Sequence, residues 1–273
     1  SMASSNAPPR SYVYDARGNI LSDGLRAYSW DALDRCTSVT RGGITTAYQY
    51  DAQDRRVVET TGADAVTYVF DGLLPVEKRN AAGIAMQRYV YGAAMHEPVR
   101  LVNIDSNGVE AAYALHADVM GDIVRVTDAT GQIVEQYEYN VYGERIVIDP
   151  ATHAIRTAST IGNPFGYRGY RFNEKTSLYN LPCRDYDPTT GSFVSSDPAR
   201  DGLNWYMYTN GDPVNMWDPM GLDDVNLQAL AGVGHLSMNE TERLIWLRNV
   251  HNVFDSLDYG NSSSAANEAR NLV

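Results

Sequence analysis

The chain has 273 residues, of which 44% are hydrophobic and 21% are charged, so it is long enough to bury a core. Its formal net charge of −12 disfavours contact with phosphate backbones, which argues against nucleic-acid binding by the core. No apolar run approaches the roughly 20 residues of a membrane-spanning helix, and no signal peptide is recognisable.

The first residues precede any repeated pattern. Ser1, Met2 and Ala3 resemble the remnant of a removed expression tag. We therefore expect residues 1–10 to be a tag remnant and linker, and the folded part to begin at residue 11.

From residue 11 the chain repeats a short pattern in which two aromatic residues, separated by one position, are followed by Asp, Asn or Gly. Four of the repeated aspartates are spaced 16, 20 and 20 residues apart, at Asp15, Asp31, Asp51 and Asp71. Regular spacing of this kind is typical of stacked structural repeats. The clearest copies of the pattern begin at Tyr12, Tyr28, Tyr48, Tyr68, Tyr89 and Tyr137.

Each copy predicts a strand, a turn and a second strand. Side chains alternate along a strand, so the two rings of a copy lie on one face. The 19 tyrosines, against 5 phenylalanines, suit half-buried strands, because each ring is apolar and carries a polar tip. Asp or Asn followed by Gly is typical of a turn. A single hairpin cannot bury its rings, so we predict a mainly β fold in which antiparallel hairpins form a long, curving sheet.

The C-terminal tail, residues 223–273, differs in kind. Ser237 and Glu240 fit a helix capping box, and apolar residues then recur at helical spacing. We predict a short helical tail, with an amphipathic helix over about residues 238–258.

Three motif blocks follow the repeats, at residues 163–169, 178–198 and 204–222. Together with the tyrosine-aspartate repeats they resemble the Rhs repeat-associated core of YD-repeat proteins, and their most specific element is Asp218-Pro219-Met220-Gly221-Leu222. Related families are bacterial polymorphic toxins, toxin-complex C subunits and extracellular teneurins. The resemblance implies that residues 11–222 are a segment of a spiralling β-sheet shell, and that residues 223–273 begin a variable payload.

The resemblance also implies an activity. Such shells enclose a C-terminal payload and cut their own chain after the Asp-Pro-x-Gly-Leu element, here between Leu222 and Asp223. The carried-over acidic pair is Asp197 and Asp218, with Arg184 nearby. Hydrolysis of an amide by two carboxyls requires that one activates water while the other gives a proton. Arg184 is expected to orient one carboxylate through a bidentate contact and to keep it ionised.

Other interpretations of these residues remain open. Asp-Pro also starts ordinary turns, and Asp187 is expected to be structural for that reason. Residues 199–203 are shorter than the family's usual stretch, which affects the loop beside Asp197. The repeats could instead form a structural or adhesive module that binds protein or glycan partners. In a second alternative, the tail is part of a toxin enzyme.

No cofactor or metal is expected. The five histidines have no metal-ligand spacing with each other or with cysteine. Cys36 and Cys183 are too few for a disulfide framework, and buried thiols are expected.

The expected partners are the chain's own payload, upstream shell repeats, and an immunity protein or a secretion-system or toxin-complex partner. The family also implies a protein that a bacterium secretes or exports.

Overall fold

The repeats form one continuous antiparallel sheet. The computed structural model describes residues 10–198, 204–222 and 224–226. Fifteen strands follow one another in chain order, each hydrogen-bonded to the next. They are β1 (Val13–Tyr14), β2 (Ile20–Ser22), β3 (Arg26–Trp30), β4 (Cys36–Arg41), β5 (Ile44–Tyr50), β6 (Arg56–Thr61), β7 (Asp64–Asp71), β8 (Leu74–Asn80), β9 (Ala85–Tyr91), β10 (Pro98–Ile104), β11 (Glu110–Ala117), β12 (Ile123–Thr127), β13 (Ile133–Tyr139), β14 (Arg145–Ile148) and β15 (Ile155–Arg156).

The repeated aspartates close the hairpins as their turn chemistry predicts. Asp51 is representative, because its Oδ1 atom accepts hydrogen bonds from the backbone N–H groups of Gln53 at 2.9 Å and Arg55 at 3.1 Å. Asp54, which stands where other copies have glycine, adopts a φ of 59°. Asp71 differs, since it pairs with Leu74 in the β7–β8 ladder, which leaves a tighter connection.

The repeated rings are core residues. The first ring of each central pair is buried, with Tyr28, Tyr48, Tyr68, Tyr89 and Tyr137 each at most 9% exposed. Three of the second rings are tyrosines, and each of their hydroxyls donates to a backbone carbonyl of an earlier strand. These bonds join Tyr50 to Cys36 at 2.7 Å, Tyr91 to Pro75 at 2.9 Å and Tyr139 to Ile123 at 2.7 Å.

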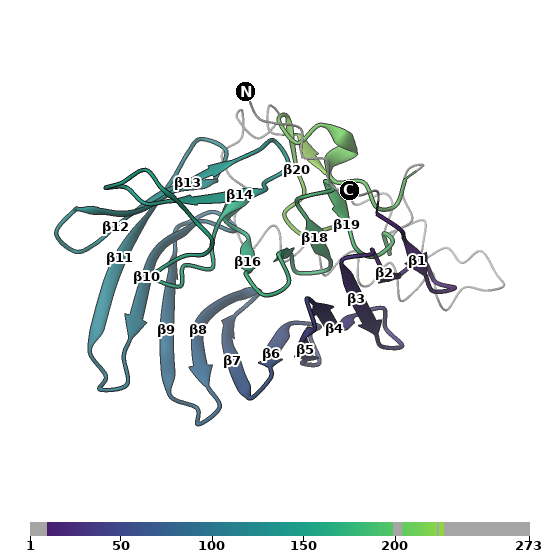
Figure 1. Ribbon diagram of the computed structural model, residues 1–273, viewed down its shortest axis with the longest axis horizontal. Helices are drawn as coiled ribbons and strands as arrows, with labels where there is room; N and C mark the ends of the chain where they lie inside the picture. Colours follow the sequence, from purple (N-terminus) through teal and green to yellow (C-terminus); the bar gives the residue numbers. More distant parts are fainter. Residues whose placement is uncertain (1–9, 199–203, 223, 227–273) are drawn as a thin grey trace, which may run out of the picture.

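The C-terminal motif blocks form a second layer, around which the long sheet curves (Figure 1). Phe165 packs in a cluster with Tyr89 and Leu101 of the sheet, and Leu178 and Val194 pack with Tyr28 and Tyr48. The layer contains the 3-10 helices η1 (Tyr167–Gly169) and η2 (Thr209–Gly211), a four-stranded sheet and a two-stranded sheet. Its strands are β16 (Arg171–Asn173), β17 (Leu178–Asn180), β18 (Asp185–Asp187), β19 (Ser192–Phe193), β20 (Met216–Trp217) and β21 (Val225–Asn226).

Buried ion pairs also connect the two layers. Arg26 of β3 binds Asp187 at 2.7 Å, and Arg56 of β6 binds Asp185 at 2.6 Å. All four side chains are at least 95% buried. Asp187 therefore has the structural role expected of it, and Asp185 faces the sheet.

The predicted mainly β, antiparallel fold is confirmed. In the part of the chain that the structure describes, the only helices are the short η1 and η2, and none is long and apolar enough to cross a membrane. The predicted helix over residues 238–258 lies outside the described residues.

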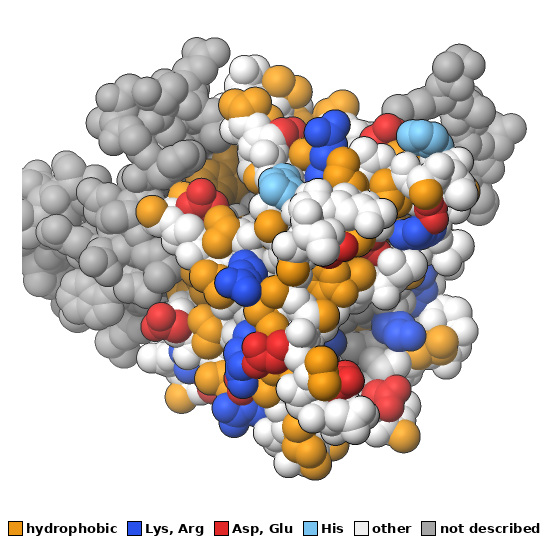
Figure 2. Space-filling view, turned by 90° about the vertical axis from the view of Figure 1, so that its left-hand side faces the viewer, with side chains coloured by type: hydrophobic (Ala, Val, Ile, Leu, Met, Phe, Trp, Pro, Cys, Tyr) orange, Lys and Arg blue, Asp and Glu red, His pale blue; other side chains and the backbone are white. Residues whose placement is uncertain are grey.

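On the face shown in Figure 2, acidic and basic side chains are interspersed with hydrophobic ones. Cys36 is buried as expected, whereas Cys183 is exposed, which corrects that expectation.

Candidate functional site

The second layer brings the three predicted site residues into one buried region. Arg184 directly precedes β18, Asp197 follows β19, and Asp218 directly follows β20. Arg184 and Asp197 are each 6% exposed and Asp218 is 1% exposed. Charged side chains are rarely buried to this extent without partners, so their contacts decide what the site can do.

Asp218 holds the chain that leads to the predicted cut. Its Oδ1 atom accepts hydrogen bonds from the backbone N–H groups of Gly221 at 2.7 Å and Leu222 at 2.9 Å. It is therefore a turn residue, as the alternative interpretation of Asp-Pro predicts. Burial nevertheless raises the pKa of Asp218 to about 6, against the opposing effects of Arg184 and the Leu222 N–H group.

Arg184 lies between Asp218 and two carbonyl groups. Its Nη2 atom is 3.6 Å from Asp218 Oδ2, Nη1 donates to the Trp205 carbonyl at 3.0 Å, and Nε donates to the Gly221 carbonyl. Its guanidinium also lies 3.7 Å from the centre of the Phe193 ring.

The contact between Arg184 and Asp218 is thus single and long. The charge of Arg184 lowers the pKa of Asp218, but burial outweighs this attraction, so the pKa of that carboxyl rises. Burial likewise lowers the pKa of Arg184, while the charges of Asp218 and Asp197 oppose that shift.

Asp197 is joined to Arg184 through a shared acceptor. The Asp197 backbone N–H donates to the Trp205 carbonyl at 2.9 Å, and the same carbonyl accepts from Arg184. The charge of Asp197 acts on both Arg184 and Asp224. The structure therefore brings Asp197 and Asp218 close to the guanidinium of Arg184.

Asp224 is a third carboxyl in this region, which the sequence reasoning missed. Its Oδ2 atom accepts a hydrogen bond from Asn210 Nδ2 at 2.7 Å. Burial raises the pKa of Asp224, and Arg184 and the Thr209 N–H group oppose that rise. Its position two residues after Leu222 was the only sequence signal, and adjacency alone does not distinguish a site residue from a solvated one.

Leu222 lies in the loop of a β-hairpin. Met216 and Trp217 of β20 pair with Asn226 and Val225 of β21, so residues 218–222 lie between the two strands of this hairpin. Asp223, the second residue of the predicted cut, is outside the described residues. The predicted cut therefore falls between two segments that are each fixed to the shell.

Further contacts hold the loop from the N-terminal side. His96 Nε2 is 2.8 Å from the Pro219 carbonyl, and Tyr170 donates to the Asp218 carbonyl at 2.8 Å. Burial lowers the pKa of His96 to about 4, so the ring is neutral near pH 7 and donates through its Nε2 hydrogen. Nothing in the sequence around His96 pointed to this role.

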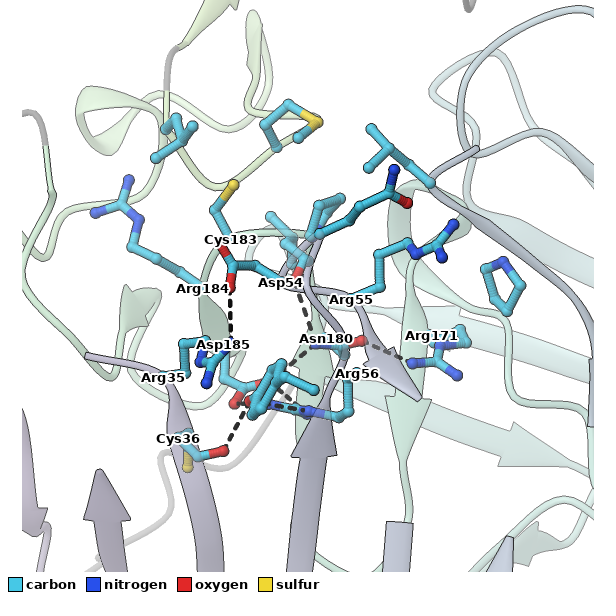
Figure 3. Close-up of a pocket in the computed structure, with 18 of the residues that line it drawn as sticks. Arg35, Cys36, Asp54, Arg55, Arg56, Arg171, Asn180, Cys183, Arg184 and Asp185 are labelled. Carbon is cyan, nitrogen blue, oxygen red and sulfur yellow. Dashed lines mark hydrogen bonds and ion pairs between the residues drawn. The ribbon is translucent and has the colours of Figure 1, made fainter. Parts of the chain in front are cut away.

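Leu222 also lines a cavity of about 250 Å³ between the two layers. The opposite wall includes Cys36, Tyr50 and Arg56 of the long sheet. Figure 3 shows Arg56 and Asp185 pointing toward each other in this cavity, and Arg171 bound to Asn180. Within the described ranges, no three His, Cys, Asp or Glu side chains are grouped so that they could hold a metal ion.

The sequence matches the family model described as Teneurin YD-shell over residues 5–214, a match that ends just before Asp218. It is 33% identical over 222 residues to the tRNA nuclease WapA of Bacillus subtilis (strain 168). It is also 30% identical over 161 residues to the toxin subunit YenC1 of Yersinia entomophaga. These alignments cover 77% and 52% of this chain, but only 9% of WapA and 16% of YenC1.

The fold is similar to that of solved toxin structures. The crystal structure of TcdB2-TccC3-TEV aligns with a TM-score of 0.60 and 22% identity, over 77% of this chain and 11% of that one. The fold described above is therefore also found in a solved toxin structure. This chain spans only a small part of each of these proteins.

Proposed function

Because this chain belongs to the teneurin YD-shell family, we propose that it is a toxin-shell segment that encloses its own C-terminal payload and cuts itself after Leu222. Residues 11–222 would then be the shell with its cleavage site, and residues 223–273 the start of the payload. Upstream repeats, and a toxin-complex or secretion partner or an immunity protein, are its proposed partners. Secretion or export from a bacterium belongs to the same proposal.

The observation that carries self-cleavage is the state of Asp218. This carboxyl is 1% exposed, its pKa is raised to about 6, and it binds the N–H groups of the two residues before the proposed cut. A carboxyl with such a pKa can hold a proton near neutral pH and give it up during reaction. Fixing the Leu222 backbone beside it replaces diffusion of a substrate by a permanent contact.

The proposed reaction is hydrolysis of one peptide bond. One carboxylate, assigned to Asp197, takes a proton from water while the oxygen attacks the carbonyl carbon of Leu222. Asp218, in its protonated form, gives its proton to the nitrogen of Asp223 as the carbon–nitrogen bond breaks. The products are a carboxyl group at Leu222 and an amino group at Asp223, and the carboxyl's proton passes to the amine to leave a carboxylate and an ammonium group. Arg184 contacts Asp218 and the Gly221 carbonyl, and its charge interacts with that of Asp197.

Intact mass spectrometry of the purified chain tests this proposal. Wild type is expected to give two masses that meet at Leu222 and Asp223, whereas Asp197→Asn and Asp218→Asn each give one uncut mass. Asparagine at position 218 keeps an oxygen that accepts the turn's hydrogen bonds, so loss of cutting would not be a simple loss of the turn.

Asp149→Asn is the matched control, because Asp149 precedes Pro150 and its Oδ1 atom also accepts two backbone N–H groups, both at 2.9 Å. This variant should be cut like wild type. A single intact mass for wild type after prolonged incubation would reject self-cleavage.

The adhesive alternative required exposed repeat rings. In the structure the first rings of the central pairs are buried under the second layer, so that face offers little aromatic surface to a glycan or protein. The alternative in which the tail is part of a toxin enzyme concerns residues beyond those described. Toxicity of the tail in cells would test it.

A further inference from the structure

We propose that the cavity between the two layers binds a small organic anion, whose carboxylate pairs with Arg171 and whose apolar part contacts the cavity wall. Arg184 and Leu222 line the same cavity, but Arg171 has no part in the proposed cut. Binding is therefore expected whether or not the chain cuts itself.

The wall of this cavity is rich in arginine, although the whole chain has a net charge of −12. Five of its described lining residues are arginines, contributed by both layers, and Figure 3 shows all five around the cavity. Four of them have a carboxylate partner, so their charges are balanced within the protein. These pairs are Arg35–Asp54 at 2.7 Å, Arg55–Asp51 at 2.6 Å, Arg56–Asp185 at 2.6 Å and Arg184–Asp218 at 3.6 Å.

Arg171 of β16 is the fifth, and it has no such partner among the described residues. Its Nη2 atom donates to Asn180 Oδ1 at 2.7 Å, and its guanidinium lies 4.2 Å from the centre of the Tyr68 ring. The Nη1 atom is buried and has no hydrogen-bond partner in the described part of the chain. A buried cation with an unused donor is costly, and an anion bound beside it would remove that cost.

The nearby carboxylate of Glu59 does not take this place. Its charge acts on Arg171, but the two side chains form no ion pair in the ranges that the structure describes. Instead, Glu59 Oε2 accepts from the Tyr68 hydroxyl and from Asn173 Nδ2, both at 3.4 Å. The Nη1 atom of Arg171 is therefore left for a ligand.

The other side chains of the wall indicate what kind of anion fits. Because a single guanidinium lacks a partner, a monoanion matches the charge better than a phosphate dianion does. Much of the remaining wall is apolar, including Leu74, Phe165, Leu181 and Met220, each at most 7% exposed. The volume of about 250 Å³ is below that of typical drug-sized pockets, so the ligand is small.

The open side of the cavity is basic as well. Arg35 and Arg55 line the cavity and have side chains that are 25% and 23% exposed. Each guanidinium is held over an aromatic ring, 4.9 Å from the centre of Tyr50 and 5.1 Å from the centre of Phe70. Fixed positive groups at an entrance attract anions toward the interior.

Isothermal titration of the full-length chain with benzoate tests the proposal, because benzoate combines one carboxylate with a small apolar ring. One molecule is expected to bind per chain. Benzamide, which has the same ring but no charge, should bind at least about tenfold more weakly. Inorganic phosphate should also bind more weakly than benzoate, since it has no apolar part.

Two arginine variants then locate the site. Arg171→Met should weaken benzoate binding at least about tenfold. Arg145→Met is the matched control and should bind like wild type. Arg145 is also buried, at 1% exposure, and lies over the rings of Tyr137 and Phe172, but it pairs with Glu174 and is not among the residues that line this cavity.

Circular dichroism checks that each variant is folded, and intact mass reports the cut separately. A folded Arg171→Met that binds benzoate like wild type would overturn the proposal, as would the absence of binding at millimolar benzoate. If Arg171→Met does not fold, the comparison of ligands on wild type decides: benzamide or phosphate binding as tightly as benzoate would reject an organic carboxylate as the ligand.

Discussion

Asp218 and Asp149 show how one turn chemistry gives two different carboxyls. Each precedes a proline and accepts backbone N–H groups through Oδ1. For Asp149, which is only partly buried, these bonds and Arg156 lower the pKa to about 2. For Asp218, burial outweighs similar bonds and raises the pKa to about 6. The degree to which each carboxyl is buried from solvent, more than its hydrogen bonds, thus determines which aspartate can carry a proton near neutral pH.

This difference predicts the pH dependence of the proposed cut. If Asp218 gives its proton to the leaving amine, the reactive form is the protonated one, which is lost as the pH rises through about 6. The first-order rate should then fall by about tenfold per pH unit well above that value. It can be measured by following intact mass after the denatured chain is refolded in buffers of different pH.

The Asp149→Asn variant should follow the same pH profile as wild type, because the pKa of Asp149, about 2, lies far below the pH range in which the rate is expected to change. A rate that stays constant from pH 5 to about pH 8 would mean that the proton does not come from Asp218.

At the scale of single elements, β6 and β18 are joined by a buried ion pair. Arg56 donates to both oxygens of Asp185, at 3.0 and 2.6 Å, and its guanidinium lies 3.8 Å from the centre of the Tyr48 ring. The pair positions β18, whose first residue directly follows Arg184. The long sheet therefore supports the candidate site through this contact.

Replacing Arg56 by methionine should destabilise the fold by about 3–5 kcal/mol, because Asp185 would remain buried without its main partner. Adding Asp185→Asn should recover part of this loss, since the uncompensated charge is then removed. Urea unfolding in the Asp197→Asn background, where the chain is expected to stay uncut, gives both values.

Arg88→Met is the matched control for this comparison. Arg88 pairs with Glu77 at 3.0 Å and Glu110 at 2.7 Å on an exposed surface, where such pairs contribute little. Equal effects of the two arginine substitutions would contradict the role assigned to burial.

At the scale of the whole molecule, the sheet and the second layer share their cores. Phe165 is 1% exposed and packs edge-on against Tyr89 and Tyr91, with ring centres 5.1 and 5.8 Å apart. Leu178 and Val194 fill the corresponding position near the start of the sheet. Since each of these clusters contains residues of both layers, we expect the two layers to unfold together.

Phe165→Ala should lower the free energy of unfolding by about 3–5 kcal/mol, because a buried ring is lost from the interface. Far-UV circular dichroism, which reports the strands, and near-UV circular dichroism, which reports tyrosine packing, should show coincident transitions before and after the substitution. Ile155→Ala, at a side chain that is 74% exposed, should have little effect. Separate transitions for the two signals would mean that the layers are stable independently.

The sequence by itself determined the parts of this protein that depend on local chemistry. Alternating rings predicted the strands, and aspartate at a fixed distance after them predicted the turns, because both follow from backbone periodicity and short-range hydrogen bonds. Familiar motif blocks also drew attention to Asp197, Asp218 and Arg184, which the structure brings together.

Only the tertiary structure decided which carboxyls are buried and what faces them. Asp185 binds Arg56, which is 129 positions away in the chain, and Asp224 binds Asn210 of η2, which is 14 positions away. Arg184 makes one long contact with Asp218 and donates to the carbonyls of Gly221 and Trp205. Burial and long-range neighbours set these pKa values and contacts, and neither is encoded in the few residues around each position.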